Sequence, residues 1–367
     1  MNLLCRPLVP LLLLCWFPGL PGARGGEVAV KADQGGKLTL AEQPKPHLRR
    51  QGDCVYILPD AVDDDLAALK TMQGVKRVFA EFRMASGLRH QSPPPTAQLS
   101  AAGLAHLKGL KELEVLILLE MQLTDDGLAQ IGEISGLREL WLDGDRAVTD
   151  KGLAHLSGLK QLRVLRFFGA PITDAGLAHI KGLTELQTLL LGYARVTDAG
   201  MPIIAGFHKL KTLDLQNTGI TDAGLASLGC LTTLDWLCFR NTRITSDGLS
   251  RLQNLTNLTW LFLDDTDVGD DGLKHLKKMS KLKTLGLCTT KVLTEQGLSC
   301  LAALQNLERL RLRRAKITGA GLASLVALSN LKELELVGKG VPAITEAEIN
   351  KLWHAMPKIN ISVHAWD

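Results

Sequence analysis

The side chains best suited to recognising another molecule are five large aromatic residues: Trp141, Phe168, Trp236, Trp260 and Phe262. Each lies within or directly after a short apolar segment of the approximate form Leu-x-x-Leu-x-Leu, at one of its variable positions. A large aromatic side chain that its own segment does not cover is typical of a binding surface. The alternative is that Trp236 and Trp260 pack across neighbouring strands and only stabilise the sheet.

A second candidate for binding is a dense group of arginines: Arg309, Arg311, Arg313 and Arg314. Guanidinium groups bind phosphates and carboxylates through paired hydrogen bonds. Glu333 and Glu335 follow Arg309 and Arg311 by 24 residues, and we expect each Arg–Glu pair to lie side by side and neutralise its charge. The same holds for Arg240 and Asp264. Arg313 and Arg314 therefore remain as candidates for contact with a partner.

Histidine and aspartate do not form a recognisable metal site in the sequence. Four histidines occupy the same position in four of the repeats: His106, His155, His179 and His275. Metal ligands must converge within a few ångströms, and such equivalent residues lie farther apart. The aspartates between Asp264 and Asp271 do not have the spacing of the calcium loop D-x-[DN]-x-[DN]-G. We expect neither a metal ion nor a cofactor.

The sequence lacks the short motifs of common active sites: His-Glu-x-x-His, Gly-x-Ser-x-Gly and a phosphate loop ending in Gly-Lys-Ser or Gly-Lys-Thr. Its most regular aspartates recur in Thr-Asp-x-Gly-Leu, directly before apolar segments, where Thr or Asp caps a helix. An active site needs a unique group of convergent residues, which repetition does not supply. We predict that the protein is not an enzyme.

The segments that carry these residues recur along the sequence with a single period. Glycines recur at intervals of 24 or 25 residues, mostly within Thr-Asp-x-Gly-Leu: Gly103, Gly127, Gly152, Gly176, Gly200, Gly224, Gly248, Gly272, Gly297 and Gly321. Each is followed by a Leu-x-x-Leu-x-Leu segment. A fixed period of this length indicates a solenoid, in which one unit stacks on copies of itself.

Residues 210–234 illustrate the unit. Leu213 and Leu215 alternate with polar residues, which predicts a short strand with both leucines facing inward. Thr221 and Asp222 precede an apolar segment and are expected to cap a short helix. The variable positions around the inner leucines then face the other side of the sheet. They form three columns that include the aromatic and arginine residues above.

This pattern resembles the leucine-rich repeat family, with its consensus Leu-x-x-Leu-x-Leu-x-x-(Asn/Cys)-x-Leu. The 24-residue Thr-Asp-x-Gly-Leu variant is similar to that of bacterial exported repeat proteins and of F-box-type repeat tails. The resemblance implies an α/β solenoid of horseshoe shape, with a parallel β-sheet on the concave face and short helices on the convex face. Where the family often has Asn, this chain has Thr218, Thr242 and Thr266, whose hydroxyl groups could cap loop N–H groups instead.

The ends of the chain depart from the repeat. Residues 1–25 hold an apolar run and a small-residue cleavage site, which predicts a signal peptide. We expect a flexible linker at 26–52, a degenerate capping repeat with a Pro-rich loop at 53–98, and the repeat array at 99–340. A C-terminal capping repeat is expected at 341–367, with Trp353 covering the last exposed part of the core.

The net charge, the hydropathy and the cysteine spacing of the chain limit the classes of partner and of cross-link that it can have. A net charge of +4 over 367 residues is too small for a general nucleic-acid binder, so no nucleic-acid partner is expected. No stretch after the leader is long and apolar enough to span a bilayer, so we expect no membrane span in the mature chain. Cys238 and Cys288 fall two repeats apart, beyond the roughly 7 Å between Cα atoms that a disulfide allows.

We therefore predict an exported, secreted or periplasmic scaffold that binds a protein or peptide on its concave face. A cell-envelope glycan stacked on the same aromatic residues is an alternative. A further alternative, from the F-box resemblance, is an intracellular ubiquitin-ligase adaptor. Such an adaptor needs a helical module before the repeats, and residues 26–58 are too short and too polar to supply it.

Overall fold

The computed structural model describes residues 30–32, 38–40, 47–58, 61–81, 99–288, 293–313, 319–337 and 345–364. The chain divides into two units. The first comprises Met1–Pro46 and Met84–Ser92, and its described part is a hairpin of β1 (Val30–Ala32) and β2 (Leu38–Leu40), paired antiparallel. The second comprises His47–Arg83 and Pro93–Asp367 and holds all the other described residues.

A 14-stranded sheet runs through the second unit, with its strands in chain order. β3 pairs antiparallel with β4, and each later neighbouring pair is parallel. The strands are β3 (Leu48–Gln51), β4 (Cys54–Ile57), β5 (Arg77–Glu81), β6 (Val115–Leu119), β7 (Glu139–Asp143), β8 (Val164–Phe168), β9 (Thr188–Leu190), β10 (Thr212–Asp214), β11 (Trp236–Cys238), β12 (Trp260–Phe262), β13 (Thr284–Leu287), β14 (Arg309–Arg313), β15 (Glu333–Val337) and β16 (Asn360–His364).

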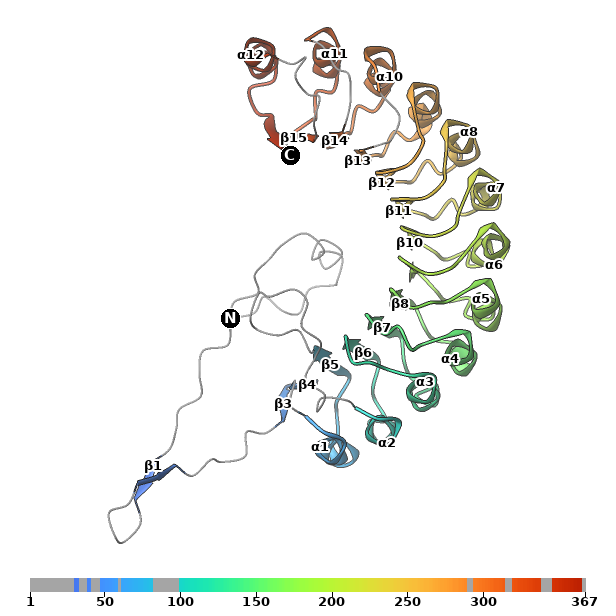
Figure 1. The fold of residues 1–367 in the computed structure, drawn as a ribbon, viewed down its shortest axis with the longest axis vertical. Coiled ribbons are helices and arrows are strands. Elements are labelled where there is room, and N and C mark those ends of the chain that lie inside the picture. The colour runs from blue at the N-terminus through green and yellow to red at the C-terminus, as the bar shows by residue number, and fades with distance from the viewer. Residues whose placement is uncertain are drawn as a thin grey trace. The chain divides into compact units, whose positions relative to one another are not determined.

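Short helices connect the strands and lie on the outer side of the curved second unit, while the sheet lines the inner side (Figure 1). The α-helices are α1 (Asp63–Leu66), α2 (Ala101–Leu104), α3 (Asp125–Ile131), α4 (Asp150–His155), α5 (Asp174–Ile180), α6 (Met201–Ala205), α7 (Asp222–Leu225), α8 (Ser246–Leu249), α9 (Asp270–Leu273), α10 (Glu295–Ser299), α11 (Gly319–Ser324) and α12 (Glu346–Ala355). The 3-10 helices are Ala67–Thr71, Ala105–Gly109, Leu156–Gly158, Asp198–Gly200, Leu228–Cys230, Ser250–Leu252, Lys274–Lys278, Cys300–Ala303 and Leu325–Ala327. The predicted horseshoe solenoid is confirmed.

One continuous hydrophobic core fills the space between sheet and helices. It is built from equivalent leucines of successive repeats, and Leu213, Leu225 and Leu237 are each fully buried. Strand residues alternate between this core and the concave face because successive side chains of a strand point in opposite directions. The core therefore fixes which residues of each strand point to the concave face.

In the recurring Thr-Asp-x-Gly-Leu motif, capping of the helix by the threonine is confirmed, whereas the expected capping by the aspartate is wrong. The threonine is the N-cap: Thr245 Oγ1 accepts the Asp247 N–H at 3.2 Å. The aspartate instead holds the next repeat, because Asp222 accepts the Thr245 N–H at 2.8 Å and the Thr245 hydroxyl at 2.6 Å. The same contact joins seven pairs in all among the described residues: Asp63–Ser100, Asp125–Thr149, Asp150–Thr173, Asp174–Thr197, Asp198–Thr221, Asp222–Thr245 and Asp270–Thr294. We call this series the Asp–Thr ladder.

The glycine of the motif is explained by the same ladder. A Cβ atom added to Gly248 would lie 2.2 Å from Asp222 Oδ1, and one added to Gly224 would lie 2.4 Å from Asp198 Oδ1. A real Cβ cannot approach an oxygen so closely. Glycine is therefore required where the carboxylate of the preceding repeat reaches across.

The Thr residues in place of the family's Asn also act differently from our expectation. The hydroxyl groups of Thr218, Thr242 and Thr266 donate to the carbonyl oxygens of Leu215, Phe239 and Leu263, at 2.6–2.7 Å. They satisfy buried acceptors at the ends of the strands rather than loop N–H groups.

Both ends of the array differ in detail from the sequence analysis. Leu48–Gln51, which fell in the predicted linker, form β3, because Gly52 (φ +63°) and Asp53 make a two-residue turn into β4. Trp353 was expected to cover the core, but its side chain is 45% exposed. Leu352, Met356 and Ile359 are buried in its place, since α12 turns Leu352 rather than its neighbour toward the sheet.

Within the described part of the chain, no helix has both the length and the apolar character needed to cross a membrane.

Candidate binding surface on the concave sheet face

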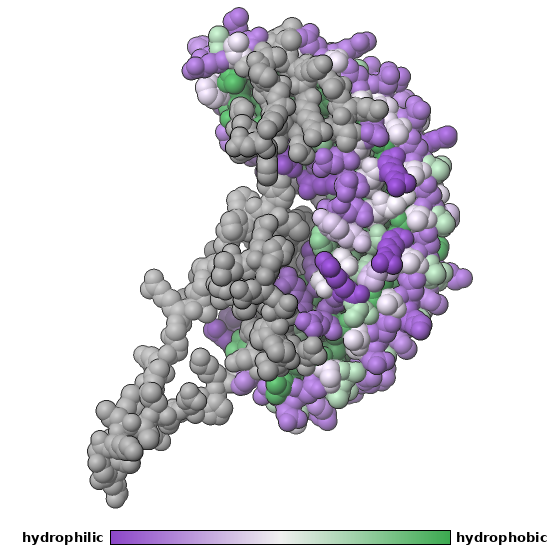
Figure 2. Space-filling model, viewed as in Figure 1, coloured by the Kyte–Doolittle hydropathy of each residue, from purple (hydrophilic) through white to green (hydrophobic). Residues whose placement is uncertain are grey.

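The strand register places the variable residues in columns across the concave face. Trp236 lies opposite Trp260, and Cys238 lies opposite Phe262, on adjacent strands β11 and β12. Phe262 in turn lies opposite Gly286 on β13. In contrast, hydrophilic side chains cover most of the outer surface visible in Figure 2.

Trp236, Trp260 and Phe262 form an aromatic platform on β11 and β12. The Phe262 ring centroid lies 5.5 Å from that of Trp236 and 6.4 Å from that of Trp260. All three side chains are half-buried. The guanidinium carbon of Arg240 lies 4.6 Å from the Phe262 ring centroid, and that of Arg309 lies 5.7 Å from the Trp260 ring centroid, within cation–π distance.

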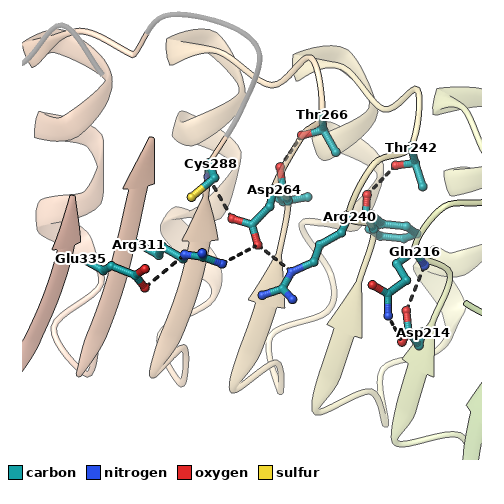
Figure 3. Close-up of polar contacts among 11 residues, drawn as sticks. Asp214, Gln216, Arg240, Thr242, Asp264, Thr266, Cys288, Arg311 and Glu335 are labelled. Carbon is teal, nitrogen blue, oxygen red and sulfur yellow. Dashed lines mark hydrogen bonds and ion pairs between the residues drawn. The ribbon is translucent and has the colours of Figure 1, made fainter. Parts of the chain in front are cut away.

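An ion network crosses the sheet beside this platform (Figure 3). Asp264, only 4% exposed, lies between two arginines, with its Oδ2 at 2.6 Å from Arg240 Nε and 4.0 Å from Arg311 Nη1. The Arg311 Nε lies 3.1 Å from Glu335 Oε2. A Cβ atom on Gly286 of β13 would lie 2.9 Å from Asp264 Oδ2. The glycine therefore leaves room for the Asp264 carboxylate.

The pairings expected from the sequence are present in this network. Arg309 Nε lies 2.8 Å from Glu333 Oε2, and Arg240 and Arg311 contact their expected acidic neighbours. The Arg313 backbone is part of β14, but its side chain lies outside the described residues, as does Arg314 entirely. Their role as partner-binding residues stays a prediction.

A second aromatic group lies on β7 to β9. The Arg166 guanidinium carbon lies 5.3 Å from the Trp141 ring centroid and 5.6 Å from that of Phe168, and an Arg166 nitrogen lies 2.5 Å from Asp143 Oδ2. Trp141 was expected to be open, but its side chain is 7% exposed and packs against Val115 and Ile117. A tryptophan surrounded by large apolar neighbours on adjacent strands loses its accessible face.

Sequence reasoning missed Tyr193, which extends the second aromatic group. Its ring lies 5.0 Å from that of Phe168 in an edge-on arrangement, and its side chain is 52% exposed. Its φ angle is +65°, where Asn217, Asn241 and Asp265 stand in later repeats. A bulky residue in the left-handed region costs about 1 kcal/mol or more, whereas Asn and Asp are tolerated there. An exposed aromatic in a turn position that favours Asn was the available signal.

The strand between the two aromatic groups, β10, carries the polar residues Thr212 and Asp214 on either side of Leu213. Asp214 on β10 is 6% exposed; its carboxylate accepts the Gln216 N–H at 2.9 Å and the Gln216 side-chain amide at 2.8 Å. Burial raises the pKa of Asp214, and the hydrogen bonds from Gln216 and from the Cys238 thiol, together with the positive charge of Arg166, oppose the rise.

The comparison with known families is decisive for the fold. The family described as a leucine-rich repeat region matches residues 146–366, more than half of the sequence. The chain belongs to the leucine-rich repeat family. No curated protein matches it.

Two solved leucine-rich repeat structures from Listeria monocytogenes are similar to the chain. Internalin C2 is 30% identical, with a TM-score of 0.46, and the match covers 59% of this chain and 84% of that one. An internalin F structure is 20% identical, with a TM-score of 0.44, and covers 74% of this chain and 88% of that one.

Two cysteine thiols lie on the concave face of this leucine-rich repeat protein, and neither is activated as a nucleophile. The thiols of Cys238 and Cys288 are buried there, and burial raises the pKa of both, with the charge of nearby Asp214 or Asp264 adding to the rise. Thiols kept protonated in this way are poor nucleophiles. Among the described residues, no three His, Cys, Asp or Glu side chains are arranged to hold a metal ion.

Proposed function

We propose that this leucine-rich repeat protein is an exported, non-enzymatic scaffold that binds a protein or peptide through the aromatic platform of Trp236, Trp260 and Phe262. The observation that carries the proposal is the platform itself, in which three half-buried rings lie together on the concave face. Aromatic and arginine side chains at the centre of a surface supply most of the energy in protein interfaces. Phe168 with Tyr193 provides a second contact region.

A cell-envelope glycan is the second candidate, because sugar rings also stack on tryptophan. Such stacking needs an open ring face. Arg240 lies over Phe262 and Arg309 lies over Trp260, at 4.6 and 5.7 Å from the ring centroids. These guanidinium groups occupy part of the faces that a sugar would use, and they can donate hydrogen bonds to backbone carbonyls of a peptide. The geometry therefore favours a protein or peptide.

Replacing both platform tryptophans with Trp236→Ala and Trp260→Ala is expected to abolish partner capture. Loss of two central aromatic contacts costs about 2 kcal/mol or more each, which is a loss of affinity of several hundredfold. The measurement is affinity capture from the extracytoplasmic fraction followed by mass spectrometry, with far-UV circular dichroism to confirm an unchanged fold.

The matched control is Trp353→Ala, which removes an exposed tryptophan from α12 outside the platform. Capture by this variant should equal that of the wild type. Retention of the same partner by the double platform variant would overturn the proposal, and a captured glycan in place of a protein would favour the second candidate.

A further inference from the structure

We propose that the C-terminal edge of the array, formed by β16 and α12, binds a second copy of this chain about a two-fold axis. In this dimer, β16 of one copy pairs antiparallel with β16 of the other, and the two α12 helices pack antiparallel beside each other. Both the sheet and the helical layer then continue from one copy into the next. Each copy keeps its own aromatic platform on β11 and β12, so the dimer is independent of the proposed function.

β16 is the edge strand of the 14-stranded sheet. One side of it pairs with β15, and among the described residues no strand pairs with the other side. An unpaired edge presents its N–H and C=O groups to another strand, and proteins usually protect such edges with charged residues or proline. β16 contains neither Lys, Arg, Asp, Glu nor Pro. At the opposite edge of the sheet, β3 carries the exposed residues Arg49 and Arg50. β16 is therefore the edge that is open to pairing.

Trp353 of α12 extends toward the side on which a following repeat would pack. It lies eight residues after the helix N-cap, the position that Gly229 occupies in the repeat of α7. A Cβ atom on Gly229 would lie 3.2 Å from the backbone oxygen of Arg251, which belongs to the next repeat. In the repeat of α12 this position carries a large apolar side chain instead, and 45% of it is exposed.

The hydrophobic core is incompletely covered at the same edge. Ile361 on β16 is half-buried, whereas its partner Leu334 on β15 is fully buried. Ile349 on α12 is also half-buried, whereas Leu225, at the equivalent position of α7, is fully buried. Ile349, Trp353 and Ile361 form what we call the C-terminal apolar patch. A two-fold axis brings this patch of each copy onto that of the other, so the interface is self-complementary.

The charges at the two ends of α12 favour an antiparallel copy of the same helix. The exposed Glu346 begins the helix, and the exposed Lys358 follows its C-terminal end. In an antiparallel pair, Glu346 of each copy approaches Lys358 of the other, and the opposed helix dipoles also attract. Glu346 occupies the helix position from which Asp222 reaches the following repeat, so it lies on the side of α12 that faces the dimer. A head-to-tail contact of β16 with β3 would propagate into filaments rather than close.

The first test is the oligomeric state of the full-length chain and of Trp353→Glu, measured by sedimentation velocity over a series of concentrations. The wild type should form a dimer, and Trp353→Glu should raise the Kd of the dimer by about tenfold or more, because the interface strips water from the new charge. Far-UV circular dichroism checks that the variant is folded. A wild type that stays monomeric at roughly 100 μM, or that assembles beyond the dimer, overturns the proposal. An unchanged Kd in Trp353→Glu also overturns it.

Charge reversal tests the antiparallel arrangement. Glu346→Lys and Lys358→Glu should each dimerise more weakly than the wild type, since each variant has like charges at both ends of α12. A mixture of the two should form a heterodimer about tenfold or more tighter than either homodimer, because opposite charges then meet at both ends. Lys351→Glu is the matched control, since Lys351 lies about 200° around the helix from Trp353, and it should dimerise like the wild type. Absence of the heterodimer, or a control as weak as Lys358→Glu, would overturn this arrangement.

Discussion

Gly248→Ala is expected to lower the free energy of unfolding by about 2–4 kcal/mol. The added Cβ would lie 2.2 Å from Asp222 Oδ1, and this carboxylate accepts both the N–H and the hydroxyl of Thr245. Displacing it leaves two part-buried donors without an acceptor. Without this clash, alanine would stabilise the helix by about 1 kcal/mol relative to glycine, so the sign of the effect reports on the ladder.

The chain contains its own control for this substitution. Gly127 occupies the same motif position, but Ala101 stands where the preceding repeat would place its Asp, and the nearest atoms to an added Cβ are leucine methyl carbons at 3.0 and 3.1 Å. Gly127→Ala should therefore change stability by about 1 kcal/mol or less. Urea unfolding of both variants, and of Gly248→Ala combined with Asp222→Ala, measures the coupling. Equal stability of Gly248→Ala and Gly127→Ala would refute the explanation.

Stability is expected to fall as the pH rises from about 4 to above 7, with Asp145 as a major cause. Asp145 is fully buried, and burial raises its pKa from 3.8 to about 7, although the Leu123 N–H donates to its Oδ1 at 2.9 Å. Because the folded state holds the proton more tightly than the unfolded state, this contribution is fully present below pH 4. It is lost as the pH rises through 7, by up to about 4 kcal/mol.

Asp145→Asn is expected to remove most of this dependence, since an amide does not ionise. The measurement is the free energy of unfolding in urea at pH 5 and at pH 8, for the wild type and the variant. Burial raises the pKa of Asp214 and Glu139 in the same direction, so the difference between the two proteins isolates Asp145. An equally steep decline in both proteins would show that Asp145 is not responsible.

The repeat period was sufficient to predict the solenoid, its parallel sheet and the concave columns. Each strand and each helix is predicted from local sequence patterns, and the recurrence of these patterns in every unit strengthens the prediction. The pairs Arg309–Glu333 and Arg311–Glu335 were predictable for the same reason, since equivalent residues of neighbouring strands lie side by side.

What the sequence could not reveal depends on contacts between repeats or on the depth of packing. The Asp–Thr ladder joins residues 23 or 24 positions apart in most of its contacts, and helix capping explains the same residues within one unit. The burial of Trp141 depends on its apolar neighbours across two strands. The contacts of a concave-face aspartate also depend on its surroundings, because Asp214 accepts hydrogen bonds from Gln216 whereas Asp264, the same residue type in an adjacent column, forms ion pairs with two arginines.

The Asp–Thr ladder is weakened at one joint, and the position of this joint affects how easily the solenoid bends. Between α8 and α9, Ser246 replaces the aspartate and Gly269 replaces the threonine, so one hydrogen bond of 2.9 Å, from Gly269 N to Ser246 Oγ, stands in for the usual two. The strands in front of this joint are β11 and β12, which carry Trp236 and Trp260. The joint directly behind the aromatic platform is thus expected to be more compliant than the joints that keep both hydrogen bonds of the ladder. A partner that contacts both tryptophans would therefore bend the solenoid at this joint. The local curvature of the solenoid would then differ between the free and the bound protein.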